Sequence, residues 1–161
     1  MNSLRVSEIP PQPPIHWTPT FQATGLTFTG TNSTYPTHDS VYIKQGYVVT
    51  FWIQIDLSTV TNFGTGQLKV DLPYPPHSGI MNHFPGWVWY DPSLGSPDLA
   101  NHIILNVDHL PGSQTLDLHW LGGDTPSPKP VREFVLTSTS PYTLTTASKI
   151  YINGTYFTDV L

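Results

Sequence analysis

Histidines are the residue type in this chain with the clearest capacity for metal binding or acid–base chemistry. They are His16, His38, His77, His83, His102, His109 and His119. Neither the pattern His-x-His nor the zinc-binding motif His-Glu-x-x-His occurs in the sequence. His102 and His119 each alternate with apolar residues, which predicts an outward position on two strands. Whether those strands are neighbours is open, so a paired site is the alternative to our prediction of no metal and no cofactor.

Carboxylates and hydroxyls show no catalytic arrangement either. Glycosidases need two acids held across a cleft, and the candidate acids are Asp91, Asp98, Asp108, Asp117 and Asp124. Asp91, Asp98 and Asp124 adjoin proline or glycine, a position typical of turns. No Gly-x-Ser-x-Gly motif occurs. Residues 64–66, Gly-Thr-Gly, lack the lysine of a phosphate-binding loop and predict a hairpin turn. We predict no catalytic residues and no enzyme activity.

The composition argues against several classes of partner. Charged residues make up only 11% of the 161 residues, and the formal net charge is -5 with six Lys and Arg. Nucleic-acid binding requires a clustered cationic surface, so we expect no nucleic-acid partner. No stretch approaches the roughly 18 apolar residues of a membrane-spanning helix, so we expect no membrane partner. Residues 1–14 lack the apolar core of a secretory signal, and cysteine is absent.

Alternating polarity dominates the elements that must position these residues. From Tyr47 to Leu57 every second residue is apolar and those between are mostly more polar, a period typical of β-strands. Strands are expected at residues 16–21, 26–29, 40–44, 47–57, 66–72, 86–90, 102–107, 115–121, 131–136 and 149–157. The expected core is Phe51, Ile53, Ile55, Leu68, Val70, Ile103, Leu105, Val107, Leu116, Leu118, Trp120, Phe134 and Ile150. The pattern predicts an all-β protein, an antiparallel two-sheet β-sandwich of jelly-roll-like type.

The N-terminal segment differs from the rest of the chain. Pro10, Pro11, Pro13 and Pro14 cannot donate sheet hydrogen bonds and favour an extended polyproline path. We therefore divide the chain into an extended arm at residues 1–16, which ends with Ile15 and His16, and a β-sandwich domain at residues 17–161.

Tryptophan and tyrosine mark the candidate binding surface. Trp87 and Trp89 share one face of an expected strand, and Val88 and Tyr90 share the other. A protein interface, buried packing and contact with glycan are the three interpretations of this strand. Trp52 is expected on the outward face of the long strand, under a neighbouring subunit. The candidate interface residues are Trp52, Trp87, Trp89, Tyr90, Trp120, Pro10, Pro11, Pro13, Pro14 and Ile15.

Four short motifs punctuate residues 17–157. They are the start Trp-Thr-Pro-Thr at residues 17–20, the hairpin Tyr-Ile-Lys-Gln-Gly at residues 42–46, the strand end Leu-Pro at residues 72–73 and the close Ile-Asn-Gly-Thr-Tyr-Phe at residues 152–157. In these motifs the chain resembles a β-sandwich domain of tailed-bacteriophage virion proteins. The resemblance implies a jelly-roll-like fold and a homotrimer at the virion surface. The shaft of a typical fibre is missing.

Three functions follow from the resemblance and the aromatic strand. The first is a non-enzymatic capsid decoration, or cement, protein whose partner is the major capsid protein or another virion protein. The alternative is the receptor-binding tip of a short tail fibre or baseplate appendage, which contacts host surface glycan. The third is a stand-alone carbohydrate-binding module.

Overall fold

The computed structural model describes residues 12–29, 40–90, 102–122 and 132–161. The elements in these residues are β1 (Ile15–His16), β2 (Phe21–Phe28), β3 (Val41–Gln45), β4 (Val48–Asp56), the short 3-10 helix η1 (Leu57–Thr59), β5 (Val60–Asp71), β6 (Asn82–Trp89), β7 (His102–His109), β8 (Thr115–Gly122), β9 (Arg132–Val135) and β10 (Lys149–Phe157). The prediction of an all-β, antiparallel protein is confirmed. Within the described ranges, no helix has the length and apolar character needed to cross a membrane.

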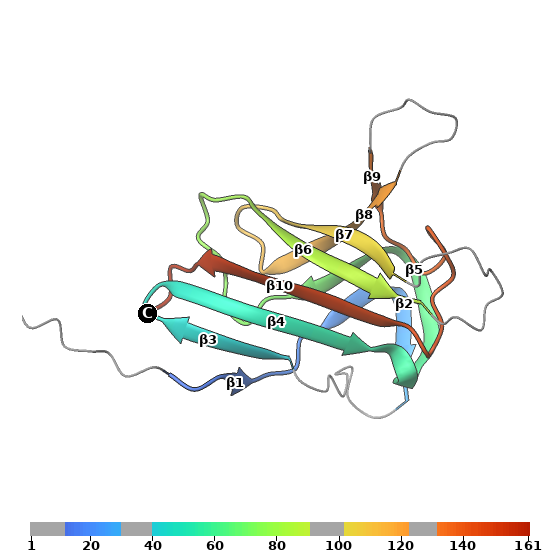
Figure 1. Ribbon diagram of the computed structural model, residues 1–161, viewed down its shortest axis with the longest axis horizontal. Coiled ribbons are helices and arrows are strands. Elements are labelled where there is room, and N and C mark those ends of the chain that lie inside the picture. The colour runs from blue at the N-terminus through green and yellow to red at the C-terminus, as the bar shows by residue number, and fades with distance from the viewer. Residues whose placement is uncertain (1–11, 30–39, 91–101, 123–131) are drawn as a thin grey trace, which may run out of the picture.

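One hydrogen-bonded sheet contains these strands. Its order is β1-β3-β4-β10-β6-β7-β8-β5-β2, and β9 pairs with β8 beside this path. A flat sheet of nine strands would be nearly 40 Å wide at about 4.8 Å per spacing. The strands at its two edges, β1 and β2, are joined by only residues 17–20, which can span at most about 18 Å. The sheet must therefore curl until its edges approach, and Figure 1 shows β3, β4, β10 and β6 in front of β5 and β2. In the described residues the strands form this one sheet, so the predicted two-sheet arrangement is not confirmed.

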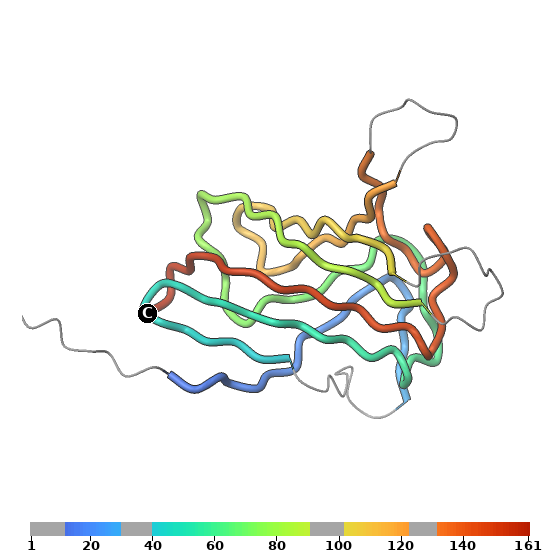
Figure 2. The backbone as a smooth tube through the Cα atoms, viewed as in Figure 1, coloured from blue at the N-terminus to red at the C-terminus, as the bar shows by residue number. Residues whose placement is uncertain are grey.

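The concave side of the curled sheet holds the core. Along β4 the residues Val49, Phe51, Ile53 and Ile55 are buried, and those between them face outward, as the alternation predicts. The backbone in Figure 2 shows how the strands wrap around this interior. Ten of the thirteen expected core residues are buried, and Ile103, Trp120 and Phe134 are half-buried. Packing of this apolar interior is the main force that holds the sheet in its curled form.

The β2–β5 pair differs from the sequence prediction. The expected hairpin turn at residues 64–66 is wrong, because β5 runs continuously through Gly64 and Gly66, and β2 is one strand across Gly25. All three glycines have positive φ angles of 64°, 81° and 76°, respectively. The register between β2 and β5 shifts between Gln22 and Thr24. Glycines that allow such irregular pairing bend and twist a strand, so these residues contribute to the curl of the sheet rather than to a turn.

The described end of the expected arm joins the sheet edge. In β1, Ile15 pairs with Tyr42 and His16 with Val41 of β3. The backbone N–H of Trp17 then donates to the carbonyl of Ser40 at 3.1 Å. Pro13, Pro14 and Ile15 are exposed, and Pro10 and Pro11 lie outside the described residues. An edge strand of two residues offers its remaining backbone groups to water or to another chain.

Candidate functional site

Four neighbouring strands carry an apolar surface on the convex side of the sheet. These are β4, β10, β6 and β7, in that order. The outer aromatic face, as we call it, consists of Trp52, Trp87, Trp89, Ile104 and Tyr151. Trp52, Trp87 and Ile104 are 43%, 39% and 65% exposed, respectively. Trp52, Trp87, Trp89 and Tyr151 alternate along their strands with buried residues, and Ile104 lies between the half-buried Ile103 and the buried Leu105, so the pleat that builds the core places all five outside.

Strand register brings the rings of this face together. Tyr151 of β10 lies directly opposite Trp87 of β6, and Trp87 lies opposite Ile104 of β7. The rings of Trp87 and Tyr151 stack with centroids 5.1 Å apart and planes inclined by 16°. Trp52 of β4 lies opposite Asn153, two residues along β10 from Tyr151. Cross-strand neighbours at this spacing stabilise one another, so the rings of Trp87 and Tyr151 hold each other in place on the face.

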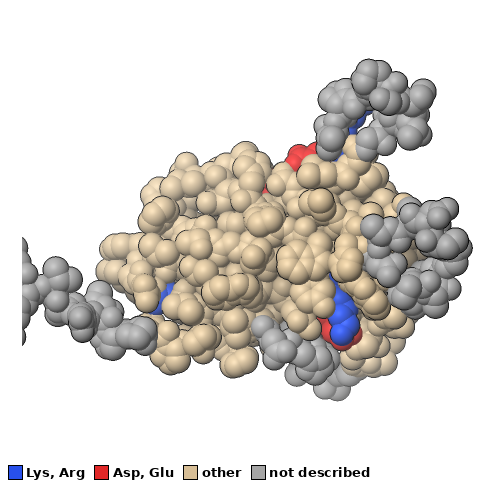
Figure 3. Space-filling model, in the orientation of Figure 1, with Lys and Arg blue, Asp and Glu red and all other residues tan. Residues whose placement is uncertain are grey.

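Two shallow hollows flank the stacked pair. One, of about 190 Å³, is lined by Trp52, Gln54, Trp87, Tyr151 and Asn153 together with the buried Ile53 and Ile152. The other, of about 270 Å³, is lined by Trp87, Trp89, His102, Lys149 and Tyr151. Each hollow therefore combines aromatic rings with two polar side chains, Gln54 and Asn153 in the first and His102 and Lys149 in the second. Figure 3 shows that this side of the molecule is covered largely by uncharged side chains, with charged groups near its margins.

Lys149 at the margin of the face is held by Asp56. Their Nζ and Oδ2 atoms are 3.3 Å apart, and the other carboxylate oxygen of Asp56 accepts a hydrogen bond from the Ser58 backbone N–H at 2.9 Å. Burial alone would raise the pKa of Asp56, but the hydrogen bonds from Ser58 and the Lys149 ammonium group together lower it below its ordinary value. The carboxylate is therefore ionised at neutral pH and fixes Lys149 beside the second hollow.

The structure does not bring all of the expected interface residues together. Trp52, Trp87 and Trp89 share the outer aromatic face, whereas Tyr90 and Trp120 point toward the core. Tyr90 is only 7% exposed and packs edge-on against Tyr142. Burial, and secondarily Tyr142, raises its pKa well above the usual range. Trp120 stacks on Phe134 with ring centroids 4.7 Å apart.

Sequence reasoning missed two members of the face, Tyr151 and Ile104. Tyr151 stands between the buried Ile150 and Ile152, so the alternation along the last strand already indicated its outward position. Ile104 gave no such signal, because residues 103–105 are all apolar. Only the register with β6 shows that Ile104 lies beside Trp87.

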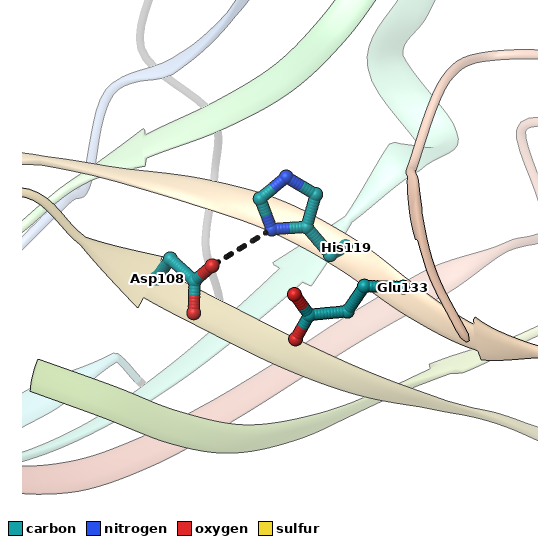
Figure 4. A group of neighbouring side chains, drawn as sticks. All are labelled: Asp108, His119 and Glu133. Carbon is teal, nitrogen blue, oxygen red and sulfur yellow. Dashed lines mark ion pairs between the residues drawn. The ribbon is translucent and has the colours of Figure 1, made fainter. Parts of the chain in front are cut away.

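A polar cluster lies on the same convex side, at β7, β8 and β9. It contains Asp108, His119 and Glu133, one from each strand (Figure 4). The two strands that carry His102 and His119 are neighbours, but the register places Asn106 opposite His119. The alternative of a His102–His119 pair is therefore not formed, and His119 meets Asp108 instead, 3.2 Å between Nδ1 and Oδ2.

Comparison with known proteins found no match to a protein-family model, to a curated protein or to a solved structure. The chemistry of the two surfaces is therefore the basis for assigning a function. The outer aromatic face offers stacking and apolar burial with a few hydrogen-bonding groups at its margins, a combination suited to adhesion.

Proposed function

We propose that this chain is a non-enzymatic binding protein that adheres to another macromolecule through its outer aromatic face. The observation that carries the proposal is the stacked pair Trp87–Tyr151, flanked by Trp52 and Ile104 on the exposed side of the sheet. Tryptophan and tyrosine dominate the energy of protein interfaces, because their large rings are rigid and lose little entropy on binding. Pre-ordered rings on adjacent strands reduce that entropic loss further.

The setting that we favour is the surface of a virus particle, where the chain acts as a capsid decoration protein. The resemblance of residues 17–157 to phage virion domains supports this setting. In this proposal the curled sheet serves as a jelly-roll-like two-layered sandwich, and residues 1–16 extend from the β1 edge as an arm. The protein is a homotrimer whose partner is the major capsid protein or another virion protein, and symmetric attachment multiplies the affinity of each contact.

Glycan contact is the second candidate, in the tip of a short tail fibre or in a carbohydrate-binding module. It is favoured by the composition of the hollows, where Gln54, Asn153 and His102 stand beside aromatic rings. Sugars present apolar faces that stack on rings and hydroxyls that bond to such polar groups.

Binding of purified protein to bare phage heads tests the first proposal, and binding to a glycan array tests the second. We expect Trp87→Ser and Trp52→Ser to abolish head binding and Tyr47→Ser to leave it unchanged. Tyr47 is a matched control, because it is 49% exposed and lies at the turn between β3 and β4, away from the face. Undiminished head binding by both tryptophan variants contradicts the proposal. Glycan binding that depends on Trp87 without head binding favours the second candidate.

A further inference from the structure

Three adjacent strands bring three metal-ligand side chains to one point on the convex side of the sheet. The strands β7, β8 and β9 are neighbours, and they carry Asp108, His119 and Glu133, respectively. One donor atom of each residue lies within 4.8 Å of those of the other two. Figure 4 shows both carboxylates directed toward the side of the imidazole ring that bears Nδ1. This spacing leaves room for one cation at the centre of the three groups.

The Nδ1 atom of His119 is unsatisfied in this arrangement. It is buried and makes no hydrogen bond to any described residue, although it lies 3.2 Å from Oδ2 of Asp108. The contact is close but is not aligned as a hydrogen bond. A buried polar nitrogen without a partner is costly. A metal ion between Nδ1 and the carboxylates would remove that cost.

The opposite ring nitrogen is already held in place. Nε2 of His119 lies 3.2 Å from the side-chain nitrogen of Gln67. If the Gln67 amide turns by half a revolution, its oxygen accepts a hydrogen bond from a protonated Nε2, and Nδ1 is left with a free lone pair. This change leaves His119 neutral, because its ring proton is carried by Nε2 instead of Nδ1. Histidines that bind metals are usually oriented by such a hydrogen bond on their second nitrogen.

The two carboxylates are also oriented by neighbours. Nδ1 of His83 lies 2.6 Å from Oδ1 of Asp108. The side-chain amide of Asn106 donates both to Oδ1 of Asp108, at 3.3 Å, and to Oε1 of Glu133. Each acid therefore keeps an oxygen atom for a cation. Asp117 stands opposite Asp108 on β8, but Lys69 pairs with Asp117 at 2.9 Å and balances its charge.

We propose that Asp108, His119 and Glu133 bind one divalent transition-metal ion, of which Zn²⁺ is the best-fitting example. Imidazole with carboxylates is a ligand set that suits zinc, whereas Ca²⁺ and Mg²⁺ prefer oxygen ligands alone. His83, Asn106 and Gln67 are positioning residues. The ion connects β9, which pairs with one edge of β8, to β7, which pairs with the other edge of β8. Three protein ligands leave a fourth position for water or for a donor atom of a partner.

The proposal departs from the sequence-based expectation that the chain binds no metal. It is independent of the outer aromatic face, so Trp87→Ser is expected to bind zinc like the wild type.

Calorimetric titration of tag-free, chelator-treated protein with Zn²⁺ tests the proposal directly. We expect one high-affinity zinc ion per chain, a rise in the melting temperature and no comparable binding of Ca²⁺. Asp108→Asn, His119→Gln and Glu133→Gln are each expected to abolish this binding. His102→Asn and Asp159→Asn change the same residue types elsewhere on the surface and are expected to leave it intact. Gln67→Ala should weaken it by roughly tenfold or more.

The wild-type protein alone provides a second readout that does not depend on variant stability. Nitrogen-15 NMR is expected to show the resonance of Nδ1 of His119 shifting on addition of one equivalent of Zn²⁺. Absence of zinc binding by the wild type overturns the proposal. So does zinc binding that leaves His119 unchanged, or that persists unaltered in folded Asp108→Asn and Glu133→Gln.

Discussion

Tyr156 shows how a single buried hydroxyl ties β10 to the segment after β5. Its Oη atom donates to the carbonyl of Tyr74 at 2.9 Å and accepts from the Tyr74 backbone N–H at 3.2 Å. Its ring packs edge-on against Phe51 and Phe84, with centroids 5.8 Å and 6.2 Å away. Burial is the main reason why the pKa of Tyr156 lies above its usual range.

We therefore expect Tyr156→Phe to lower the free energy of unfolding by about 1–3 kcal/mol, because two backbone groups lose their partner inside the protein. Urea denaturation followed by tryptophan fluorescence measures the change. Tyr47→Phe, at an exposed ring, is the control and should differ little from the wild type. Equal stability of the two variants contradicts this account of the hydroxyl.

Asp56 stabilises the protein through two contacts, and two different substitutions can separate their effects. It caps η1 through the Ser58 N–H and pairs with Lys149. Asp56→Ala loses both contacts, and we expect it to cost about 0.5–2 kcal/mol. Asparagine caps nearly as well as aspartate, so Asp56→Asn should cost less, and only through loss of the partly exposed ion pair with Lys149.

The lowered pKa of Asp56 predicts how the difference in stability between the wild type and Asp56→Asn depends on pH. The stabilisation that the ionised Asp56 provides is fully present above the unfolded-state pKa of about 3.9. It is lost as the pH falls through the lower folded-state pKa. Wild type and Asp56→Asn should thus differ near neutral pH and converge once the pH has fallen below the lowered folded-state pKa of Asp56. Urea denaturation across this range measures the difference, and a gap that widens in acid contradicts the assignment.

The pairing of β2 with β5 requires a glycine at position 64, where the two backbones come close together. Gly64 has a φ of 64°, and a Cβ atom there would meet the backbone of Thr24 and Leu26. Gly46, in the turn between β3 and β4, has a φ of 58° but open space around it. Alanine at Gly46 therefore suffers only the cost of the backbone conformation, about 1–2 kcal/mol.

We expect Gly64→Ala to destabilise the protein more than Gly46→Ala, because the strands must also separate to admit the methyl group. Thermal unfolding of the two variants provides the comparison. If Gly46→Ala is the more damaging change, the close approach of β2 and β5 at Gly64 does not limit stability.

At the scale of the whole molecule, the curled sheet separates folding from adhesion. The concave side holds the core, and the convex side carries the outer aromatic face and the polar cluster. Residues 12–16 contribute only the exposed edge strand β1. The chain from residue 17 to residue 161 is therefore expected to keep its fold.

We expect this shortened chain to melt within a few degrees of the full protein and yet to bind bare heads less tightly if residues 1–16 act as an arm. Calorimetry and co-sedimentation measure the two properties separately. A large loss of stability would mean that β1 closes the sheet, and unchanged head binding would count against the arm.

The local pattern of residues determined the strands and most of the core of this protein. Alternation at Phe51, Ile53 and Ile55 needs no knowledge of neighbours, because each residue's face follows from the pleat of its own strand. The outward position of Trp52, Trp87 and His119 followed from the same rule. The pattern did not reveal that residues 64–66 continue a strand, because glycine serves a turn and a bulge equally well.

Tertiary structure alone decided which outward residues meet. Trp87 stacks on Tyr151, and His119 faces Asp108 and Glu133, because β6 lies between β10 and β7 and because β9 returns to β8. These pairings join segments that are distant in sequence, and their register is selected by the combined burial of all inward-facing residues. A one-residue slip in any pair would move these side chains to the other face of the sheet. The aromatic face and the polar cluster are therefore products of the packed sheet, not of any single strand.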